Sequence, residues 1–189
     1  MRIIAGEARG RSIVAPKGMD TRPTQDHVRE SLFNILMHDT PDAAVLDLFA
    51  GSGALALEAV SRGAAEATLV DHNPQAIACI NRNVETLRMH AHVTVMRSDW
   101  QTALERLKQE GKKFSLVFLD PPYLMRDTGL ICTRMADAGL LKEDALVVIE
   151  HRSDAKPEPD QRFIERDRRR YGDTHIHFFA FQEGAREDV

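Results

Sequence analysis

The fold is decided by the segment Val45-Leu46-Asp47-Leu48-Phe49-Ala50-Gly51-Ser52-Gly53, which continues into the apolar run 54–57. A short run of apolar residues is typical of a buried parallel strand, and the two glycines behind it allow a tight turn into a helix. Such a turn leaves the first N–H groups of the helix free and places no Cβ in front of them, so a polar ligand can lie against the main chain. We therefore expect a cofactor at this turn.

The spacing Gly51-x-Gly53-x-x-Ala56 also satisfies the dinucleotide-binding fingerprint, and Asp71 ends the next apolar run at the place where that fingerprint has an acidic residue. This pattern does not by itself name the cofactor. Because no Lys-Ser or Lys-Thr pair follows the glycines, the pattern argues against a loop that binds nucleoside triphosphates.

Composition and length limit the class of protein. A chain of 189 residues with 43% hydrophobic residues suits one globular domain with a small appendage. Its longest apolar runs are too short to span a bilayer and its first residues are not a signal peptide, so we expect a soluble cytoplasmic protein with no membrane partner. Cys79 and Cys132 lack metal-ligand spacing, and His175 with His177 has no third ligand nearby, so we expect no metal site.

Residues 1–24 are basic on a chain whose net charge is −4, with five Lys or Arg residues against two acidic ones. Two short stretches, 2–5 and 11–14, have the pattern of strands on either side of a turn with glycines, and they predict a hairpin. We expect this hairpin to be exposed. It is either a contact surface for nucleic-acid phosphates or a solvated arm without a partner, and composition does not separate the two.

The rest of the chain alternates strand and helix patterns after a first helix over 25–38, which has Thr24 as its N-cap. Strands are predicted at 44–49, 67–71, 92–97, 115–120 and 145–150, and helices at 53–62, 74–88, 100–110 and 128–138. Two more strands, 163–170 and 175–181, are expected to add an antiparallel hairpin. Right-handed crossovers bring the carboxyl ends of the parallel strands to one rim, where ligands of open α/β sheets bind.

The predicted fold class is therefore α/β, with a doubly wound, mostly parallel seven-stranded sheet, an antiparallel C-terminal hairpin, and a small N-terminal β-hairpin plus helix. We divide the chain into an N-terminal extension, 1–40, and a cofactor-binding catalytic domain, 41–189.

The segment Asp120-Pro121-Pro122-Tyr123 separates the possible cofactors. It follows the apolar run 116–119, and the two prolines hold the loop extended without an N–H to donate. Asp120 and the Pro121 carbonyl can then both accept hydrogen bonds from one exocyclic amino group, while Tyr123 offers a ring on which a base can stack. The alternative is a rigid turn with a surface tyrosine, which an aspartate on the binding rim disfavours.

At these residues the chain resembles the class I S-adenosylmethionine-dependent methyltransferases that methylate amino groups and carry an Asp/Asn-Pro-Pro-Tyr/Phe motif. It is more closely similar to the RsmD family of bacterial small-subunit (16S) ribosomal RNA guanine-N2 methyltransferases. The N-terminal signature of that family is matched at 2–6 with 9–11 and at 22–24 with 28–34, and its closing hairpin at 171–174. The resemblance covers nearly the full length.

The resemblance implies a Rossmann-like methyltransferase fold, S-adenosyl-L-methionine as cofactor and small-subunit ribosomal RNA as partner, as free RNA or in a ribonucleoprotein particle, with the enzyme a monomer. The implied cofactor-binding residues are Asp47, Phe49, Ala50, Gly51, Ser52, Gly53, Asp71, His72, Asp99 and Trp100. Asp71 would hold the ribose hydroxyls and Asp99 the adenine amino group. The implied catalytic residues are Asp120, Pro121, Pro122 and Tyr123. The candidate RNA-binding residues are Arg2, Arg9, Arg11, Arg22 and Arg29.

Three alternatives remain open at the level of the sequence. An NAD-dependent oxidoreductase fits the glycine fingerprint and Asp71 but leaves 120–123 without a function. A non-catalytic RNA-binding module would keep the pocket without the reaction. Methylation of adenine N6, in RNA or DNA, would use the same chemistry on a different base, because the motif alone does not identify the base.

Overall fold

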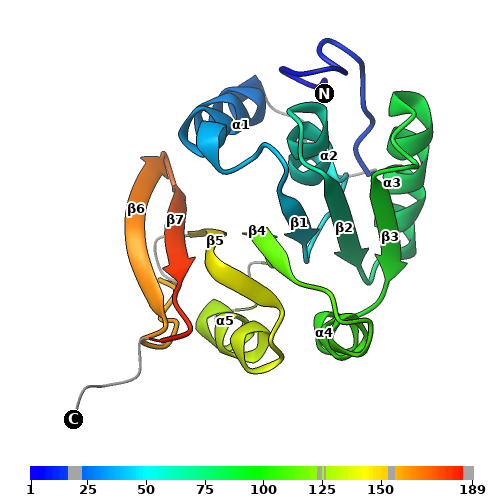
Figure 1. Cartoon of the computed structure of the whole chain (residues 1–189). Coiled ribbons are helices and arrows are strands. Elements are labelled where there is room, and N and C mark those ends of the chain that lie inside the picture. The colour runs from blue at the N-terminus through cyan, green and yellow to red at the C-terminus, as the bar shows by residue number, and fades with distance from the viewer. Residues whose placement is uncertain (17–22, 123–124, 126, 153–155, 185–189) are drawn as a thin grey trace.

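The computed structural model describes residues 1–16, 23–122, 125, 127–152 and 156–184. Its centre is a seven-stranded sheet with the strand order β3-β2-β1-β4-β5-β7-β6 and with helices on both faces (Figure 1). The strands β1 to β5 run parallel, whereas β7 is antiparallel to both β5 and β6. The predicted doubly wound α/β fold with an antiparallel C-terminal hairpin is confirmed.

The predicted elements form close to their expected bounds. The strands are β1 (Ala44–Asp47), β2 (Glu66–Asp71), β3 (Val93–Arg97), β4 (Phe114–Leu119), β5 (Leu141–Arg152), β6 (Phe163–Tyr171) and β7 (Thr174–Phe181). The helices are α1 (Pro23–Ile35) with the 3-10 turn η1 (Leu36–His38), α2 (Ala54–Ser61), α3 (Pro74–Leu87), α4 (Trp100–Gln109) and α5 (Thr128–Asp137). The strand β5 begins earlier than expected, since its first residue Leu141 pairs with Phe114 before an irregularity in the register.

Each face of the sheet has its own apolar core. On one face α1, α2 and α3 bury side chains such as Phe33, Leu57 and Ile80 against Phe118 of β4. On the other face α4 and α5 pack against the alternate residues of the same strands, among them Leu46 and Val117. Side chains of successive strand residues point to opposite faces of the sheet. Membership of a residue in one core or the other therefore shows to which face the side chains at the strand ends point.

The order of the strands in the sheet shows at which strand ends a ligand site is expected. The chain proceeds outward from β1 to β2 and β3, then returns to β4 on the other side of β1 and continues to β5. The connection therefore reverses between the neighbours β1 and β4, and in open α/β sheets ligands bind at the carboxyl ends of the strands beside such a reversal.

The N-terminal arm, defined as residues 1–16, differs from its prediction. The two expected strands at 2–5 and 11–14 are reduced to a single antiparallel bridge between Arg2 and Ser12. Ile3, Ala8 and Ile13 are buried, so the arm is packed on the domain and only part of it is exposed. The strands do not continue because main-chain N–H groups of the arm bond instead to the Glu58 carboxylate and to Ser61 of α2.

In the part of the chain that the structure describes, no helix is long and apolar enough to cross a bilayer.

Candidate active site

The turn after β1 has the tight geometry that its glycines predict. Gly51 and Gly53 adopt φ angles of 55° and 78°, in the left-handed region that favours glycine. A Cβ on Gly53 would lie 2.8 Å from the Cδ2 atom of Leu69, so a side chain there would have to displace buried Leu69. The Ala50 N–H donates to the Val70 carbonyl at 2.9 Å and ties the turn to the end of β2. The turn is thus held in a fixed position at the rim.

Asp47 is the last residue of β1 and is nearly inaccessible to solvent. Burial raises its pKa from 3.8 to about 7, and the nearby Asp71 adds to the increase, while hydrogen bonds from the main chain of Ala56 and Phe49 oppose it. None of the ion pairs formed among the described residues includes Asp47. A buried carboxyl without a cationic partner is suited to a positively charged ligand.

Asp71, at the end of β2, connects two loops of the rim. Its Oδ2 accepts from the Gly51 N–H and its Oδ1 from the Asn73 N–H, both at 2.9 Å. These bonds orient the carboxylate beside the glycine turn. His72 is mostly exposed, with its Nδ1 3.8 Å from Asp71 Oδ1.

Asp99 lies at the end of the third strand and caps α4. Its Oδ1 accepts from the Thr102 N–H at 2.9 Å and its Oδ2 from the Thr102 hydroxyl at 2.8 Å, and these bonds lower the pKa of the Asp99 carboxyl. The side chain is therefore oriented before any ligand arrives. Trp100 and Phe49 are partly buried against the core beneath α4, which leaves only part of each ring for a cofactor.

Asp120 follows β4, the strand next to β1, so the second motif lies beside the first. Asp120 is an exposed residue, yet desolvation of its carboxyl by the surrounding protein, followed by the negative charges of Glu150 and Asp47, raises its pKa well above the usual range. Pro121 is buried and Pro122 is exposed, with the Pro122 carbonyl accepting from the Met125 N–H at 2.8 Å. Tyr123 lies outside the described residues, so its stacking role stays a prediction.

Glu150 is a residue of this site that the sequence analysis missed. The register of β4 and β5 ends with Leu119 opposite Ile149, so Asp120 and Glu150 are the next residues on two neighbouring strands. Both continue the alternation that points Phe118 and Val148 toward the face of α1, and burial raises the pKa of Glu150 as well. The one available signal was an acidic residue directly after an apolar strand, the same signal that identified Asp71.

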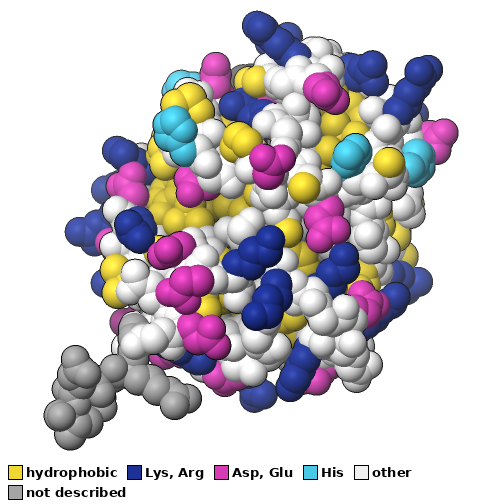
Figure 2. Space-filling model, in the orientation of Figure 1, with side chains coloured by type: hydrophobic (Ala, Val, Ile, Leu, Met, Phe, Trp, Pro, Cys, Tyr) yellow, Lys and Arg dark blue, Asp and Glu magenta, His cyan; other side chains and the backbone are white. Residues whose placement is uncertain are grey.

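The candidate RNA-binding arginines do not all lie at the surface. Arg2 and Arg9 are exposed on the N-terminal arm, as is Arg11, whose Nη1 donates to the Leu87 carbonyl at 3.3 Å. Lys and Arg side chains project at the top of Figure 2, where the N-terminal arm lies. Arg22 lies outside the described residues.

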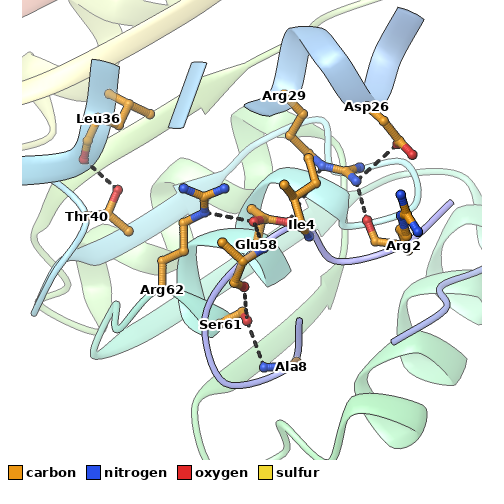
Figure 3. A network of polar contacts seen from close by, with 11 residues as sticks. Arg2, Ile4, Ala8, Asp26, Arg29, Leu36, Thr40, Glu58, Ser61 and Arg62 are labelled. Atoms are coloured by element: carbon orange, nitrogen blue, oxygen red, sulfur yellow. Dashed lines mark hydrogen bonds and ion pairs between the residues drawn. The ribbon is translucent and has the colours of Figure 1, made fainter. Parts of the chain in front are cut away.

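Arg29 is a correction to the sequence analysis, because its side chain is only 5% exposed. Its Nη2 donates to the Arg2 carbonyl and to Asp26 Oδ1, and its Nε lies 3.8 Å from Glu58 Oε2 (Figure 3). The side chain thus fastens α1 to the N-terminal arm and to α2. A guanidinium that faces inward in this way cannot reach an RNA phosphate without unfolding this contact.

The histidines of β7 lie beside His151 of β5. The rings of His151 and His177 lie side by side with centroids 4.8 Å apart, and Nδ1 of His177 lies 3.2 Å from Glu165 Oε2. Across the residues that the structure describes, no three His, Cys, Asp or Glu side chains are placed to hold a metal ion.

Comparison with known proteins shows which proteins this chain is similar to. Residues 1–180 match the family model described as Conserved hypothetical protein 95. Ribosomal RNA small subunit methyltransferase D of Escherichia coli is 40% identical over 153 residues, which cover 79% of this chain and 74% of that protein. The solved structure of yhhF from Escherichia coli has a TM-score of 0.86 and 34% identity, and the match covers 97% of this chain and 98% of yhhF.

A more distant structure shares the fold alone. SMU.776, solved in complex with SAH, has a TM-score of 0.70 at 15% identity, covering 83% of this chain and 49% of SMU.776.

Proposed function

This chain belongs to the RsmD family of S-adenosylmethionine-dependent ribosomal RNA small subunit methyltransferases, and from this premise we propose that it methylates the exocyclic N2 amine of a guanine in small-subunit ribosomal RNA. The observation that carries the proposal is the position of Asp120. Its carboxyl follows β4, directly beside the β1 turn in which Asp47 is buried, so a cofactor at that turn and a base at Asp120 would meet.

The side chains of the rim fit S-adenosylmethionine, which carries a methyl group on a positively charged sulfonium. Asp47 offers a buried negative charge without a cationic partner among the described residues. Asp71 offers carboxylate oxygens toward a ribose diol while it already holds the Gly51 N–H. Asp99 stands at the neighbouring strand end with both oxygens held by Thr102, and there it would accept a hydrogen bond from the adenine amino group.

Asp120 would prepare the amine for reaction. The lone pair on guanine N2 is delocalised into the ring, so the amine becomes nucleophilic only when acceptors hold its N–H bonds and localise that pair. The Asp120 carboxylate and the Pro121 carbonyl would supply those acceptors. As the new N–C bond forms, the C–S bond breaks, its electron pair stays on sulfur, and the nitrogen loses a proton.

Glu150 would support Asp120 in taking up that proton. Burial raises the pKa of both carboxyl groups, and the negative charges of Glu150 and Asp47 raise the pKa of Asp120 further. A carboxylate with a raised pKa is a better proton acceptor near neutral pH than one with its ordinary pKa. The pair would therefore hold the proton between Asp120 and Glu150 until solvent removes it.

The decisive experiment uses small subunits that lack the modification, labelled S-adenosylmethionine and the variant Asp120→Ala. We expect the wild-type enzyme to yield N2-methylguanosine on mass spectrometry of the digested RNA. The Asp120→Ala variant should lose at least about a hundredfold in rate, the range for removing one group that stabilises developing charge. Its S-adenosylhomocysteine affinity, measured by calorimetry, should stay within about twofold because Asp120 would contact the base.

Each outcome separates a competing function. N6-methyladenosine as product would show that the target base is adenine and not guanine. Methyl transfer to DNA in place of RNA would show that the substrate is DNA. NAD binding without a response to S-adenosylhomocysteine would favour an oxidoreductase. RNA binding without any methyl transfer would favour a non-catalytic module. As a ribosomal RNA enzyme the protein would act in the cytoplasm, and gel filtration with light scattering would test whether it acts as a monomer.

A further inference from the structure

A cavity apart from the carboxyl groups of the candidate active site lies between α1 and the β6–β7 hairpin. It measures about 480 Å3 and is lined by Ser31, Asn34, Ile35, Arg169, Arg170 and Tyr171. This volume lies within the usual range of about 300–1,000 Å3 for ligand sites. None of the residues that line it takes part in the methyl-transfer site described above.

The sheet register relates this cavity to the proposed target base. Asp120 and Glu150 follow the last paired residues of β4 and β5, Glu150 is paired with Ile176 of β7, and Ile176 with Arg169 of β6. These four residues form one row across the sheet. With neighbouring strands about 4.8 Å apart, Arg169 is about 14 Å along the row from Asp120. The backbone beside a base held at Asp120 can reach that far.

The row also shows which side of the hairpin faces the cavity. Directly paired strand residues point to the same face, and Ile176 belongs to the core on the side of α1. Arg169 and Tyr171 therefore point toward α1, whereas Arg168, paired with His177, points to the opposite face. By the same register Arg170, paired with His175, has the orientation of Arg168, so Arg169 is the arginine among residues 168–170 that faces α1, although Arg170 also lines the cavity.

The cavity wall is rigid and its charge suits an anion. The hydroxyls of Tyr171 and Ser31 are 2.6 Å apart and hold the hairpin against α1. The Nη2 atom of Arg169 lies 2.8 Å from Asp167 Oδ2, and Nε of Arg170 donates to the Gly172 carbonyl at 2.9 Å. These contacts orient both guanidinium groups and leave further N–H groups on each for a phosphate, which arginine binds with several donors.

We propose that this cavity binds the RNA backbone next to the target guanosine, with a phosphate at Arg169, the charge of Arg170 at the cavity wall beside it, and the adjoining ribose or base against Tyr171. The inference rests on the proposed function for the position of the target base. It assigns to the C-terminal hairpin of the protein a role in holding the RNA backbone that flanks the target base when this base is extruded from the RNA helix. Extruding a base costs free energy, and contacts to the flanking backbone offset part of that cost.

The test compares two double variants on one strand. Arg169→Gln with Arg170→Gln removes the two charges at the cavity, whereas Arg166→Gln with Arg168→Gln removes two exposed charges outside it. Unmodified small subunits are the RNA probe. We expect the cavity variant to raise the KM for subunits roughly tenfold, as expected for the loss of a charge-assisted hydrogen bond, with kcat and S-adenosylmethionine affinity within about twofold. The control should change KM by less than about threefold.

Equal effects of the two double variants, or no effect of the cavity variant, would overturn the inference. A loss of thermal stability or of cofactor affinity in the cavity variant would also contradict it, because the cavity would then be a structural joint. Subunit binding by Asp120→Ala protein, with and without the cavity substitutions, needs no methyl transfer. If the product is not N2-methylguanosine and this binding still depends on Arg169 and Arg170, the proposed function is wrong, whereas the inference that the cavity binds RNA stands.

Discussion

At the scale of single residues, Asp47 places a carboxyl group of the site where water solvates it poorly. Asp47 shows the consequence for pH, since its pKa is raised from 3.8 to about 7. Between these two values the folded chain binds a proton at Asp47 that the unfolded chain has lost. The contribution of Asp47 to stability therefore falls as pH rises from about 4 to about 7. The buried charge is tolerated at a cost that a cationic ligand can offset.

This cost leads to a prediction for cofactor binding. A bound cation favours ionised Asp47, so binding should release a proton when the free carboxyl is protonated. Wild-type affinity for S-adenosylmethionine should rise roughly tenfold from pH 6 to pH 8, relative to the same comparison in Asp47→Asn, as a pKa near 7 requires. Isothermal titration in buffers of different ionisation enthalpy measures both affinity and proton release. Parallel pH profiles for the two proteins would show that Asp47 does not face the positive charge.

At the scale of elements, α2 connects the cofactor turn to the N-terminal arm. The helix begins directly after Gly53, and its buried Glu58 accepts from the main-chain N–H groups of Ile4 and Ala5 at 2.8 and 3.0 Å. Arg62 and Arg29 approach the same carboxylate at 2.7 and 3.8 Å (Figure 3). One side chain thereby holds the arm, α1 and α2 together.

We expect Glu58→Gln to lower the free energy of unfolding by about 3 kcal/mol, because the buried Arg29 would lose its main counter-charge. The control is Glu66→Gln. The carboxylate of Glu66 lies 3.2 Å from Lys112 Nζ in a partly exposed pair, and its loss should cost less than about 1 kcal/mol. Urea denaturation of both variants checks the difference. Similar losses would mean that the charge of Glu58 contributes no more than an ordinary surface pair.

At the scale of the whole molecule, the basic arm reaches the cofactor turn as well as the surface. The Asn83 side chain donates from Nδ2 to the carbonyls of Val14 and Ser52, both at 2.9 Å, and its Oδ1 accepts from the Val14 N–H. The end of the arm and the glycine turn therefore share one side chain of α3. RNA bound along the arm would lie on a segment already joined to the cofactor site.

For the arm we predict that Arg9→Ala with Arg11→Ala weakens RNA binding and lowers the slope of log affinity against log salt by about 1 to 2. Cofactor affinity should not change, because neither side chain contacts the glycine turn. Arg106→Ala with Lys108→Ala on α4, at the opposite face of the sheet, removes the same charge and serves as the control. Filter binding across a salt series provides the measurement. If the arm variant binds RNA as tightly as the wild type, the arm is a solvated extension that does not contact RNA.

The sequence by itself determined the order of the strands and helices along the chain and the acidic residues at the ends of β1, β2, β3 and β4, because apolar periodicity and glycine or proline geometry act locally along the chain. It also identified the family through its motifs. Only the tertiary structure decided the rest. Arg29 faces inward because Glu58 from another helix meets it. The strands of the arm are cut short because N–H groups of the first bond to Glu58 of α2, and the Val14 N–H of the second bonds to Asn83 of α3. Glu150 joins Asp120 because two distant strands lie side by side. The burial of a side chain, its charged partner and the strand beside it all depend on residues far apart in the chain. A local sequence pattern therefore does not predict them.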